Sequence, residues 1–281
     1  MLVCKTIAEM RDCVRRMKAG EKTVGFVPTM GYLHRGHMAL VERARRECGA
    51  VVASIFVNPL QFGPREDFAE YPRDFGRDRG MLGECGVDAL FYPSAAEMYP
   101  RGFCTHVEVA GLSDCLCGKS RPGHFRGVAT VVTKLFNIVQ PDRAYFGQKD
   151  AQQVLVIRRM VQDLNMPVEI VTVPTVREED GLAMSSRNVY LSPEQRAEAP
   201  VLYSSLQEAA RAACTGERDA RKLVEMVREK LSALKGASID YVEIRSLPDL
   251  EETEWLDAPS LLALAVRFGK TRLIDNIVLE V

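Results

Sequence analysis

The stretch TVGFVPTMGYLHRGH, residues 23–37, decides the fold of this 281-residue chain. Val24–Val27 is a short apolar run, which predicts a buried strand. Pro28 has no backbone N–H to give to a sheet, so we expect the strand to end there. Gly31 and Gly36 let the backbone turn tightly and approach a ligand closely. From about Gly36 the apolar spacing becomes helical, so the sequence predicts a strand that leads directly into a helix.

Two histidines lie at this junction. His34 and His37 fall at the predicted helix N-terminus, where free backbone N–H groups and the helix dipole favour negative charge. A metal site is one alternative for this pair, but no Glu, Asp, Cys or third His lies within helical reach of it. A purely structural role for the two rings is a second alternative. The position favours a phosphate-binding site.

The charge balance argues against several classes of partner. The chain has 37 Lys and Arg residues and 38 Asp and Glu residues, for a formal net charge of -1, whereas a nucleic-acid-binding domain usually has a basic excess. Residues 1–20 mix charged and apolar side chains, unlike a signal peptide, and no apolar run is long enough to span a membrane. We therefore expect a cytoplasmic protein that binds neither nucleic acid nor membrane.

The eight cysteines are expected to be reduced thiols, because no export signal accompanies them. Cys115 and Cys117, with Cys104, His106 and His124 nearby, form the other candidate metal cluster. The single residue between Cys115 and Cys117 differs from the two-residue gap of a zinc knuckle, so the spacing disfavours a metal site.

Strand and helix patterns alternate through the first two thirds of the chain. Further strands are predicted at 51–57, 87–92, 143–146 and 168–173, and helices at 73–85, 128–139 and 150–164. This alternation predicts a doubly wound parallel sheet, in which ligands bind beyond the carboxyl ends of the strands. The segments that follow such ends are 28–37, 58–62, 147–150 and 176–188. Residues 60–73, rich in Pro, Gly and charge, are expected to form a functional loop.

The pattern changes after Tyr190. Amphipathic helices are predicted at 193–213 and 217–234, and alternating strands at 239–244, 261–266 and 272–279. We therefore predict a Rossmann-like α/β domain over residues 1–176, followed by a smaller α+β domain over residues 177–281 that acts as a lid.

Five motifs occur in a fixed order along the chain. They are PTMGYLHRGH (28–37), FVNPLQF (56–62), GHFRGVATVV (123–132), YFGQKDAQQ (145–153) and DGLAMSSRN (180–188). Together they resemble the pantoate–β-alanine ligase family, part of the nucleotidyltransferase superfamily with a His-x-Gly-His signature. Tyr32, Arg35 and Leu60 depart from the residues that are common at these positions in the family.

This resemblance implies an ATP-dependent ligase. In the family, pantoate attacks the α-phosphate of Mg-ATP to give pantoyl adenylate and pyrophosphate, and β-alanine then displaces AMP to form pantothenate. The resemblance therefore implies ATP, pantoate and β-alanine as substrates, Mg²⁺ as the cofactor that accompanies ATP, and a homodimer as the assembly.

The resemblance also assigns site residues. The catalytic candidates are His37, His34 and Lys149. Gln61 and Gln153 would bind pantoate through neutral amides, which add no competing positive charge, and Gln61 and Asn58 would bind β-alanine. The residues assigned to ATP are Met30, Gly31, Tyr32, Leu33, His34, Arg35, Gly36, His37, Gly147, Gln148, Lys149, Asp150, Val176, Met184, Ser185, Ser186 and Arg187. Taken singly, Lys149, Asp150 and the glutamines would be interpreted as surface or helix-capping residues.

Three other functions share parts of this pattern. Another His-x-Gly-His adenylyl or cytidylyl transferase would act on a phosphate ester and form no amide. A class I aminoacyl-tRNA synthetase would have a lysine-rich Lys-Met-Ser-Lys-Ser loop, where this chain has Ala-Met-Ser-Ser-Arg over 183–187. A nucleotide-binding regulator would have no need of the two histidines, Lys149 and the serine-arginine loop together.

Overall fold

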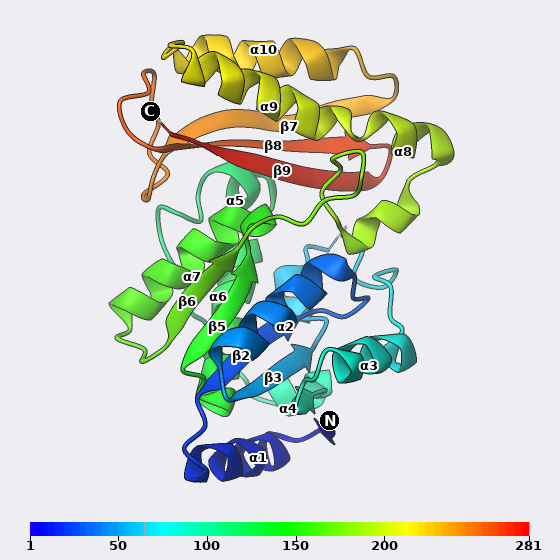
Figure 1. Cartoon of the computed structure of the whole chain (residues 1–281), viewed down its shortest axis with the longest axis vertical. Coiled ribbons are helices and arrows are strands. Elements are labelled where there is room, and N and C mark those ends of the chain that lie inside the picture. The colour runs from blue at the N-terminus through cyan, green and yellow to red at the C-terminus, as the bar shows by residue number, and fades with distance from the viewer. Residues whose placement is uncertain (65, 281) are drawn as a thin grey trace.

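Short apolar strands pair in parallel to build the larger of two sheets (Figure 1). The structure, a computed structural model, describes residues 1–64 and 66–280. The strand order is β1-β4-β3-β2-β5-β6, and every pairing is parallel. The strands are Leu2–Cys4 (β1), Val24–Thr29 (β2), Ala50–Ile55 (β3), Ala89–Phe91 (β4), Arg143–Gly147 (β5) and Glu169–Val173 (β6). The predicted doubly wound α/β fold is confirmed.

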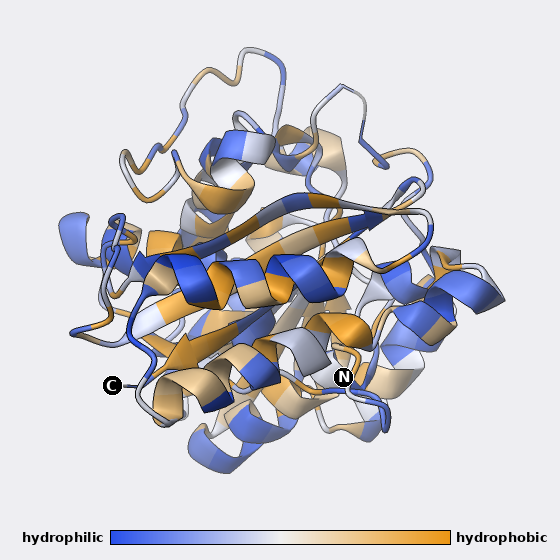
Figure 2. Ribbon diagram, turned by 90° about the horizontal axis from the view of Figure 1, so that it is seen from above, coloured by the Kyte–Doolittle hydropathy of each residue, from blue (hydrophilic) through white to orange (hydrophobic). Residues whose placement is uncertain are grey.

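Helices cover both faces of this sheet, which is why its strands are continuous apolar runs. Phe26 and Val52 belong to a core shared with α1, α6 and α7, whereas Val27 and Val51 belong to a second core shared with α2 and α3. Figure 2 shows hydrophobic residues on the strands, and hydrophobic residues alternating with hydrophilic ones along the helices. The helices are Ile7–Ala19 (α1), Arg35–Glu47 (α2), Phe75–Glu84 (α3), Ala95–Met98 (α4), Leu116–Ser120 (α5), His124–Val139 (α6) and Ala151–Asp163 (α7).

Residues 1–19 form a strand and a helix that the sequence analysis did not predict. β1 pairs with β4, and α1 follows it. Thr6 and Glu9 form a capping box at the start of α1, and the buried side of the helix carries Met10, Cys13 and Val14. The Thr-x-x-Glu signature and the helical spacing were both present in the sequence. The strand at 24–29 is therefore the second of the chain and lies inside the sheet.

Pro28 lies within β2, so the expectation that it ends the strand was wrong. The carbonyl of Val24 accepts a hydrogen bond from Asp142 beside β5, whereas that of Thr29 accepts one from Phe56 beside β3. The backbone N–H and C=O groups of successive residues point to opposite neighbouring strands, so the backbone nitrogen of Pro28, like that of Val24, points toward β5. β2 pairs with β5 only at Gly25 and Phe26, so the missing N–H of Pro28 falls beyond that ladder and costs no hydrogen bond.

Other element boundaries also differ from the predictions. The helix expected over 193–213 is two helices, Pro193–Glu198 (α8) and Val201–Cys214 (α9), with Pro200 at the N-cap of α9. α6 begins at His124, before the expected start at residue 128. Beyond the short 3-10 turn Pro59–Gln61 (η1), residues 62–64 and 66–73 contain no helix or strand, as predicted for the loop over 60–73. Arg65 of this loop lies outside the described residues.

The C-terminal part is a three-stranded antiparallel sheet covered by helices on one face. Ala237–Ser246 (β7), Ser260–Phe268 (β8) and Thr271–Leu279 (β9) pair in the order β7-β8-β9. Leu262 and Leu264 of β8 pack in a core with α9 and with Ala220–Ser232 (α10), whereas Leu261 and Ala263 join the core of the N-terminal part. The smaller sheet therefore lies between its own helices and the N-terminal part, as Figure 1 shows.

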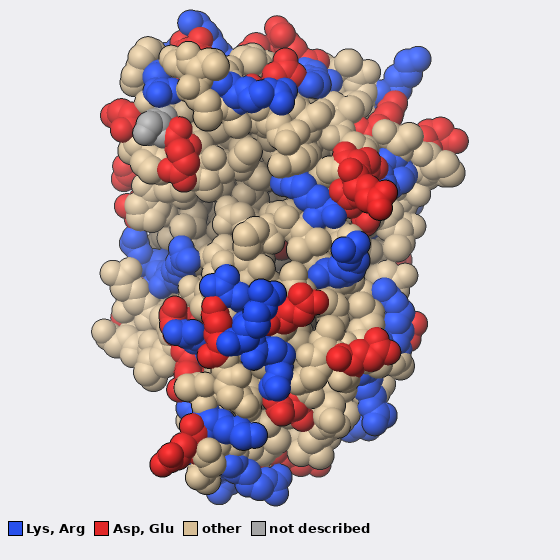
Figure 3. Space-filling model, in the orientation of Figure 1, with Lys and Arg blue, Asp and Glu red and all other residues tan. Residues whose placement is uncertain are grey.

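The face of the molecule shown in Figure 3 has no dominant charge. Lys and Arg side chains are interspersed with Asp and Glu on the face shown in Figure 3, in keeping with the net charge of -1. Among the described residues, no helix combines the length and the apolar composition that crossing a membrane requires.

Candidate active site

The four segments predicted to follow strand ends meet at one cavity of about 230 Å³. An adjoining cavity of about 1580 Å³ lies between the N-terminal part and β8–β9 and shares Gln61, Lys149, Asp150 and Gln153 with it. Of the residues predicted to form the site, those that line the smaller cavity are Met30, His34, Gly36, His37, Asn58, Gln61, Gly147, Lys149, Asp150, Gln153, Val176, Met184, Ser185, Ser186 and Arg187.

Five of the residues predicted to bind ATP line neither cavity: Gly31, Tyr32, Leu33, Arg35 and Gln148. Leu33 is fully buried under the loop, and the ring of Tyr32 stacks with Arg77, whose guanidinium carbon is 5.1 Å from the ring centroid. Arg35 is exposed, and Gln148 bonds to Asn276. These residues shape the loops on which the lining residues stand.

His34 and His37 form a compact pair at the start of α2. His34 is the N-cap, and its Nδ1 accepts the Gly36 N–H at 3.2 Å. Nδ1 of His37 accepts the His34 N–H at 3.2 Å, and the two ring centroids are 4.0 Å apart. Because both Nδ1 atoms are acceptors, each neutral ring carries its proton on Nε2. The pair can therefore offer two Nε2–H donors to an anion.

The environment keeps both rings neutral. Burial, helped by the nearby charge of Lys149, lowers the pKa of His34 to about 4. Burial also places the pKa of His37 well below its usual value, and the neighbouring His34 and Lys149 lower it further. Phosphate oxygens placed against the rings would oppose these effects, because negative charge favours the protonated imidazole.

The loop that carries the histidines is held by Asp78 on α3. This buried carboxylate accepts the N–H of Tyr32 at 2.7 Å and that of Leu33 at 2.8 Å. Tyr32 has a φ of 49°, a left-handed conformation that is unfavourable for residues other than glycine. The two hydrogen bonds stabilise that turn. Sequence analysis missed Asp78, because nothing local distinguishes it from other helix carboxylates.

Lys149 stands on a turn held by the C-terminal part. The Asn276 side chain on β9 donates to the carbonyl of Gln148 at 3.0 Å and to that of Lys149 at 2.9 Å. Lys149 Nζ is 3.4 Å from the Asp150 carboxylate. Asp150 precedes α7, but its side chain makes no capping hydrogen bond, so the carboxylate is available to the cavity.

The segment from Val176 to Arg187 closes another side. Met184 donates its backbone N–H to the Val176 carbonyl at 3.0 Å, and the Ser186 hydroxyl donates to the Tyr32 carbonyl at 3.1 Å. Arg187 makes two hydrogen bonds with Asp67, at 2.9 and 2.8 Å. This segment therefore contacts both the histidine loop and the loop over 60–73.

Asn58 and Gln61 are joined by a hydrogen bond of 3.1 Å from the Asn58 amide to Gln61 Oε1. Asn58 also donates to the Gly127 carbonyl and accepts from the Tyr99 hydroxyl and the Leu60 N–H. Its donors and acceptors are thus all used within the chain. Gln61 has a further contact, from Nε2 to the Met30 sulfur at 3.1 Å.

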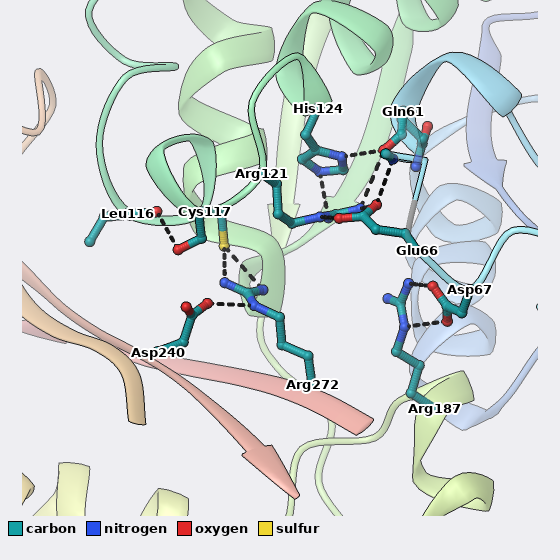
Figure 4. A network of polar contacts seen from close by, with 12 residues as sticks. Gln61, Glu66, Asp67, Leu116, Cys117, Arg121, His124, Arg187, Asp240 and Arg272 are labelled. Carbon is teal, nitrogen blue, oxygen red and sulfur yellow. Dashed lines mark hydrogen bonds and ion pairs between the residues drawn. The ribbon is translucent and has the colours of Figure 1, made fainter. Parts of the chain in front are cut away.

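Arg121, His124 and Glu66 surround the backbone of Gln61 and were missed as site residues (Figure 4). Arg121 pairs with Glu66 at 2.6 and 2.7 Å and donates to the Gln61 carbonyl at 3.3 Å. His124 Nδ1 is 2.9 Å from the same carbonyl, and its Nε2 is 3.0 Å from Arg121. The motif GHFRGVATVV begins one residue before His124 and could have directed attention to it.

Cys115 and Cys117 do not gather with other metal ligands. The Cys117 thiol lies 3.1 Å from the Tyr241 hydroxyl and beside the Arg272 guanidinium, and Cys115 donates to the Leu112 carbonyl. Throughout residues 1–64 and 66–280, no group of three or more His, Cys, Asp and Glu side chains is arranged to hold a metal ion.

Similarity to known proteins covers the whole chain. The chain is 62% identical over 279 residues to a pantothenate synthetase from Pelotomaculum thermopropionicum, covering 99% of each. The crystal structure of pantothenate synthetase from Thermus thermophilus superposes with a TM-score of 0.95 at 55% identity, covering 100% of both chains. That of pantoate-β-alanine ligase from Francisella tularensis, described as complexed with β-γ ATP and β-alanine, gives a TM-score of 0.81 at 34% identity, covering 99% of this chain and 97% of that one.

The family described as pantoate-β-alanine ligase matches residues 2–278, which is nearly the full length. This extent and the identities above exclude the three alternative functions raised by the sequence. The chain therefore belongs to the pantoate–β-alanine ligase family, whose reaction joins pantoate to β-alanine to give pantothenate.

Proposed function

We propose that the cavity of about 230 Å³ is where the pantoate carboxylate meets the α-phosphate of ATP in this chain. Pantoyl adenylate and pyrophosphate form there, and β-alanine then displaces AMP. Four segments that are distant in sequence meet at this cavity, and this is the observation that supports the proposal most. They supply two neutral imidazoles, a lysine, an arginine and several amides and hydroxyls, which suits phosphates and a polar acid.

His34, His37 and Lys149 are proposed to contact the ATP phosphates. Their Nε2–H and ammonium donors are fixed before the ligand arrives, and preorganised donors of this kind contribute about 3 kcal/mol each where charge develops. His37 is proposed to donate a proton to the departing pyrophosphate, although burial lowers its pKa well below the usual value. Phosphate charge is what would raise its pKa enough for that step.

The nucleotide is proposed to lie along the remaining assigned residues. Gly147 leaves open space where a Cβ would stand, so a nucleotide can approach its backbone. Asp150 is assigned to the ribose hydroxyls, Val176 to the adenine, and Met184, Ser185, Ser186 and Arg187 to the phosphates. Met30 and Gly36 complete the lining, and the five residues outside the cavity support the two loops.

Gln61 and Gln153 are proposed to hold pantoate, since both line the two cavities. Neutral amides can bind the hydroxyls and the carboxylate without pairing that carboxylate with a cation. Because Asn58 has no free donor or acceptor, we propose that it helps bind β-alanine by fixing the orientation of Gln61.

Mg²⁺ is proposed to enter together with the triphosphate. Mg²⁺ dehydrates reluctantly, so substrate phosphate oxygens and water can supply most of its ligands. The ion would withdraw charge from the phosphates. Loss of pyrophosphate release in EDTA, restored by Mg²⁺, is the expected result, and full activity in EDTA would contradict it.

Three further parts of the proposal concern the whole molecule. The chain is proposed to divide at residues 176 and 177, with the second part closing over ATP to exclude water from the labile adenylate. It is proposed to form a homodimer and to act in the cytoplasm. Sedimentation equilibrium tests the dimer, and X-ray scattering that is unchanged by ATP and pantoate would count against closure.

Pyrophosphate release tests the reaction and the site together. With ATP and pantoate but no β-alanine, one equivalent of pyrophosphate per active site is expected, because the pantoyl adenylate stays bound, and β-alanine should produce continuous turnover. His37→Ala should lower the rate by about 100-fold without unfolding the protein. His106→Ala, which changes an exposed histidine outside both cavities, is the matched control. A His37→Ala variant with the wild-type rate would reject the assigned role of that residue.

A further inference from the structure

Among the described residues, three Lys and Arg side chains line the smaller cavity. Each of them is paired with a carboxylate. Arg121 pairs with Glu66 at 2.6 Å, Lys149 with Asp150 at 3.4 Å, and Arg187 with Asp67 at 2.8 Å. A site built for two anions would be expected to keep such cations unpaired. The pairing therefore requires an explanation.

The Arg121–Glu66 pair is the most enclosed of the three. Its side chains are 14% and 25% exposed, against 22% and 45% for Lys149 and Asp150. Glu66 receives two hydrogen bonds from the guanidinium and one from the Gly63 N–H at 3.1 Å. Burial alone would raise the pKa of Glu66, but these bonds and the charge of Arg121 outweigh it and lower the pKa to about 2. Glu66 is thus ionised at neutral pH.

This pair lies directly against the turn that carries Gln61. Arg121 and His124 both contact the Gln61 carbonyl, and both line the same cavities as the Gln61 side chain (Figure 4). An unpaired guanidinium here would act on any carboxylate that Gln61 holds, because partly buried charges interact strongly over several ångströms.

The reaction makes such an interaction unfavourable for catalysis. A carboxylate that attacks phosphorus loses its negative charge as the new P–O bond forms. A nearby cation would therefore stabilise bound pantoate more than the transition state, which tightens binding and slows the step.

We propose that Glu66 is a positioning residue of the pantoate subsite: it neutralises Arg121 beside Gln61, so that the pantoate carboxylate is bound without a cation and stays nucleophilic. The inference rests on the proposed pantoate subsite at Gln61 and Gln153. It adds that Arg121 acts through its one hydrogen bond to the Gln61 carbonyl and not through its charge.

Binding of pantoate and of its uncharged amide, measured by calorimetry, separates charge from shape. Glu66→Gln preserves shape and leaves Arg121 charged, so the Kd for pantoate should fall about tenfold while that for the amide stays within about twofold. The rate of pantoate-dependent pyrophosphate release at saturation should fall. Arg121→Gln leaves Glu66 unpaired and should have the opposite effect, raising the Kd for pantoate about tenfold relative to the Kd for the amide.

Two comparisons complete the test. The double variant, Glu66→Gln with Arg121→Gln, should return the Kd for pantoate toward the wild-type value. Asp249→Asn is the matched control, because it leaves Arg159 without its carboxylate partner and neither residue lines either cavity. It should leave the ratio of the pantoate and amide Kd values unchanged.

Equal weakening of pantoate and amide binding in Glu66→Gln would overturn the inference and make Glu66 a structural clamp. If Glu66→Gln does not fold, Arg121→Gln decides: an unchanged ratio of the two Kd values there also overturns it. A different result would show that pantoate does not bind at Gln61 and Gln153 at all. In that case Gln61→Ala and Gln153→Ala would bind pantoate as tightly as the wild type.

Discussion

The Asp78 carboxylate accepts a hydrogen bond from the backbone N–H of Tyr32 at 2.7 Å. Among the described residues of the histidine loop, Tyr32 is the one residue other than glycine that has a positive φ. This contact joins α3 to the loop between β2 and α2. The position of both histidines therefore depends on a buried carboxylate that contacts neither of them in the hydrogen bonds of the structure.

Asp78→Ala should weaken both stability and ATP binding. It leaves the Tyr32 and Leu33 N–H groups without their partner, at a cost of about 2–4 kcal/mol, and frees the turn. Urea unfolding and the KM for ATP are the measurements. Asp74→Ala is the control, because Asp74 caps the same helix at the surface; it should cost about 1 kcal/mol and leave the KM unchanged. An unchanged KM in Asp78→Ala would mean that the loop holds its shape unaided.

Gly127→Ala should damage the turn that carries Gln61. An added Cβ would lie 2.3 Å from the Leu60 carbonyl oxygen, so α6 and η1 could not keep their present approach. We expect a loss of about 2–4 kcal/mol and a raised KM for pantoate. Gly80→Ala in α3 meets nothing within 4 Å and should instead stabilise the protein by about 0.5–1 kcal/mol. Similar unfolding curves for the two variants would contradict the close packing.

The Arg177–Asp275 pair should contribute much more to stability than an exposed pair does. Asp275 is 2% exposed and accepts two hydrogen bonds from Arg177, at 2.6 and 2.9 Å. Asp275→Ala leaves the half-buried guanidinium of Arg177 without its carboxylate partner, at a cost of about 3–5 kcal/mol. Glu254→Ala breaks the exposed pair with Arg221 and should cost less than about 1 kcal/mol. Thermal unfolding of both variants compares them directly, and equal losses would reject the distinction.

Stability should fall as the pH drops from about 6.5 toward 4. Burial lowers the pKa of both His34 and His124 to about 4, with help from Lys149 and Arg121 respectively. In this pH range the two histidines bind protons in the unfolded chain but not in the native protein. Each histidine should therefore lower the free energy of unfolding by about 2 kcal/mol at pH 5. Urea midpoints between pH 7.5 and 5 measure the loss. His124→Gln should reduce the slope, whereas the exposed His106→Gln should not.

The sequence predicted most of the larger sheet because its strands are buried on both faces and carry continuous apolar runs. It located four segments of the candidate site because parallel topology brings the carboxyl ends of neighbouring strands together. It missed β1 and α1, although the capping box of α1 is present in the sequence. It also ended β2 at Pro28. A missing N–H is costly only where a neighbouring strand would accept it, and the local sequence does not show where β5 stops pairing with β2. Asp78, Glu66 and Arg121 were missed for a similar reason: Asp78 and Arg121 bond to backbone groups distant in sequence, and Glu66 bonds to the side chain of Arg121.

The burial of β8 on both faces has a consequence for expressing the halves of the chain separately. Leu261, Ala263 and Ala265 complete the core of the N-terminal part, while Leu262 and Leu264 complete that of the C-terminal part. A fragment ending at residue 176 would expose apolar surface to water, and so would the remainder. Each fragment should aggregate when produced alone, and co-expression of the two should recover soluble material, because only the complementary fragment covers the exposed side chains.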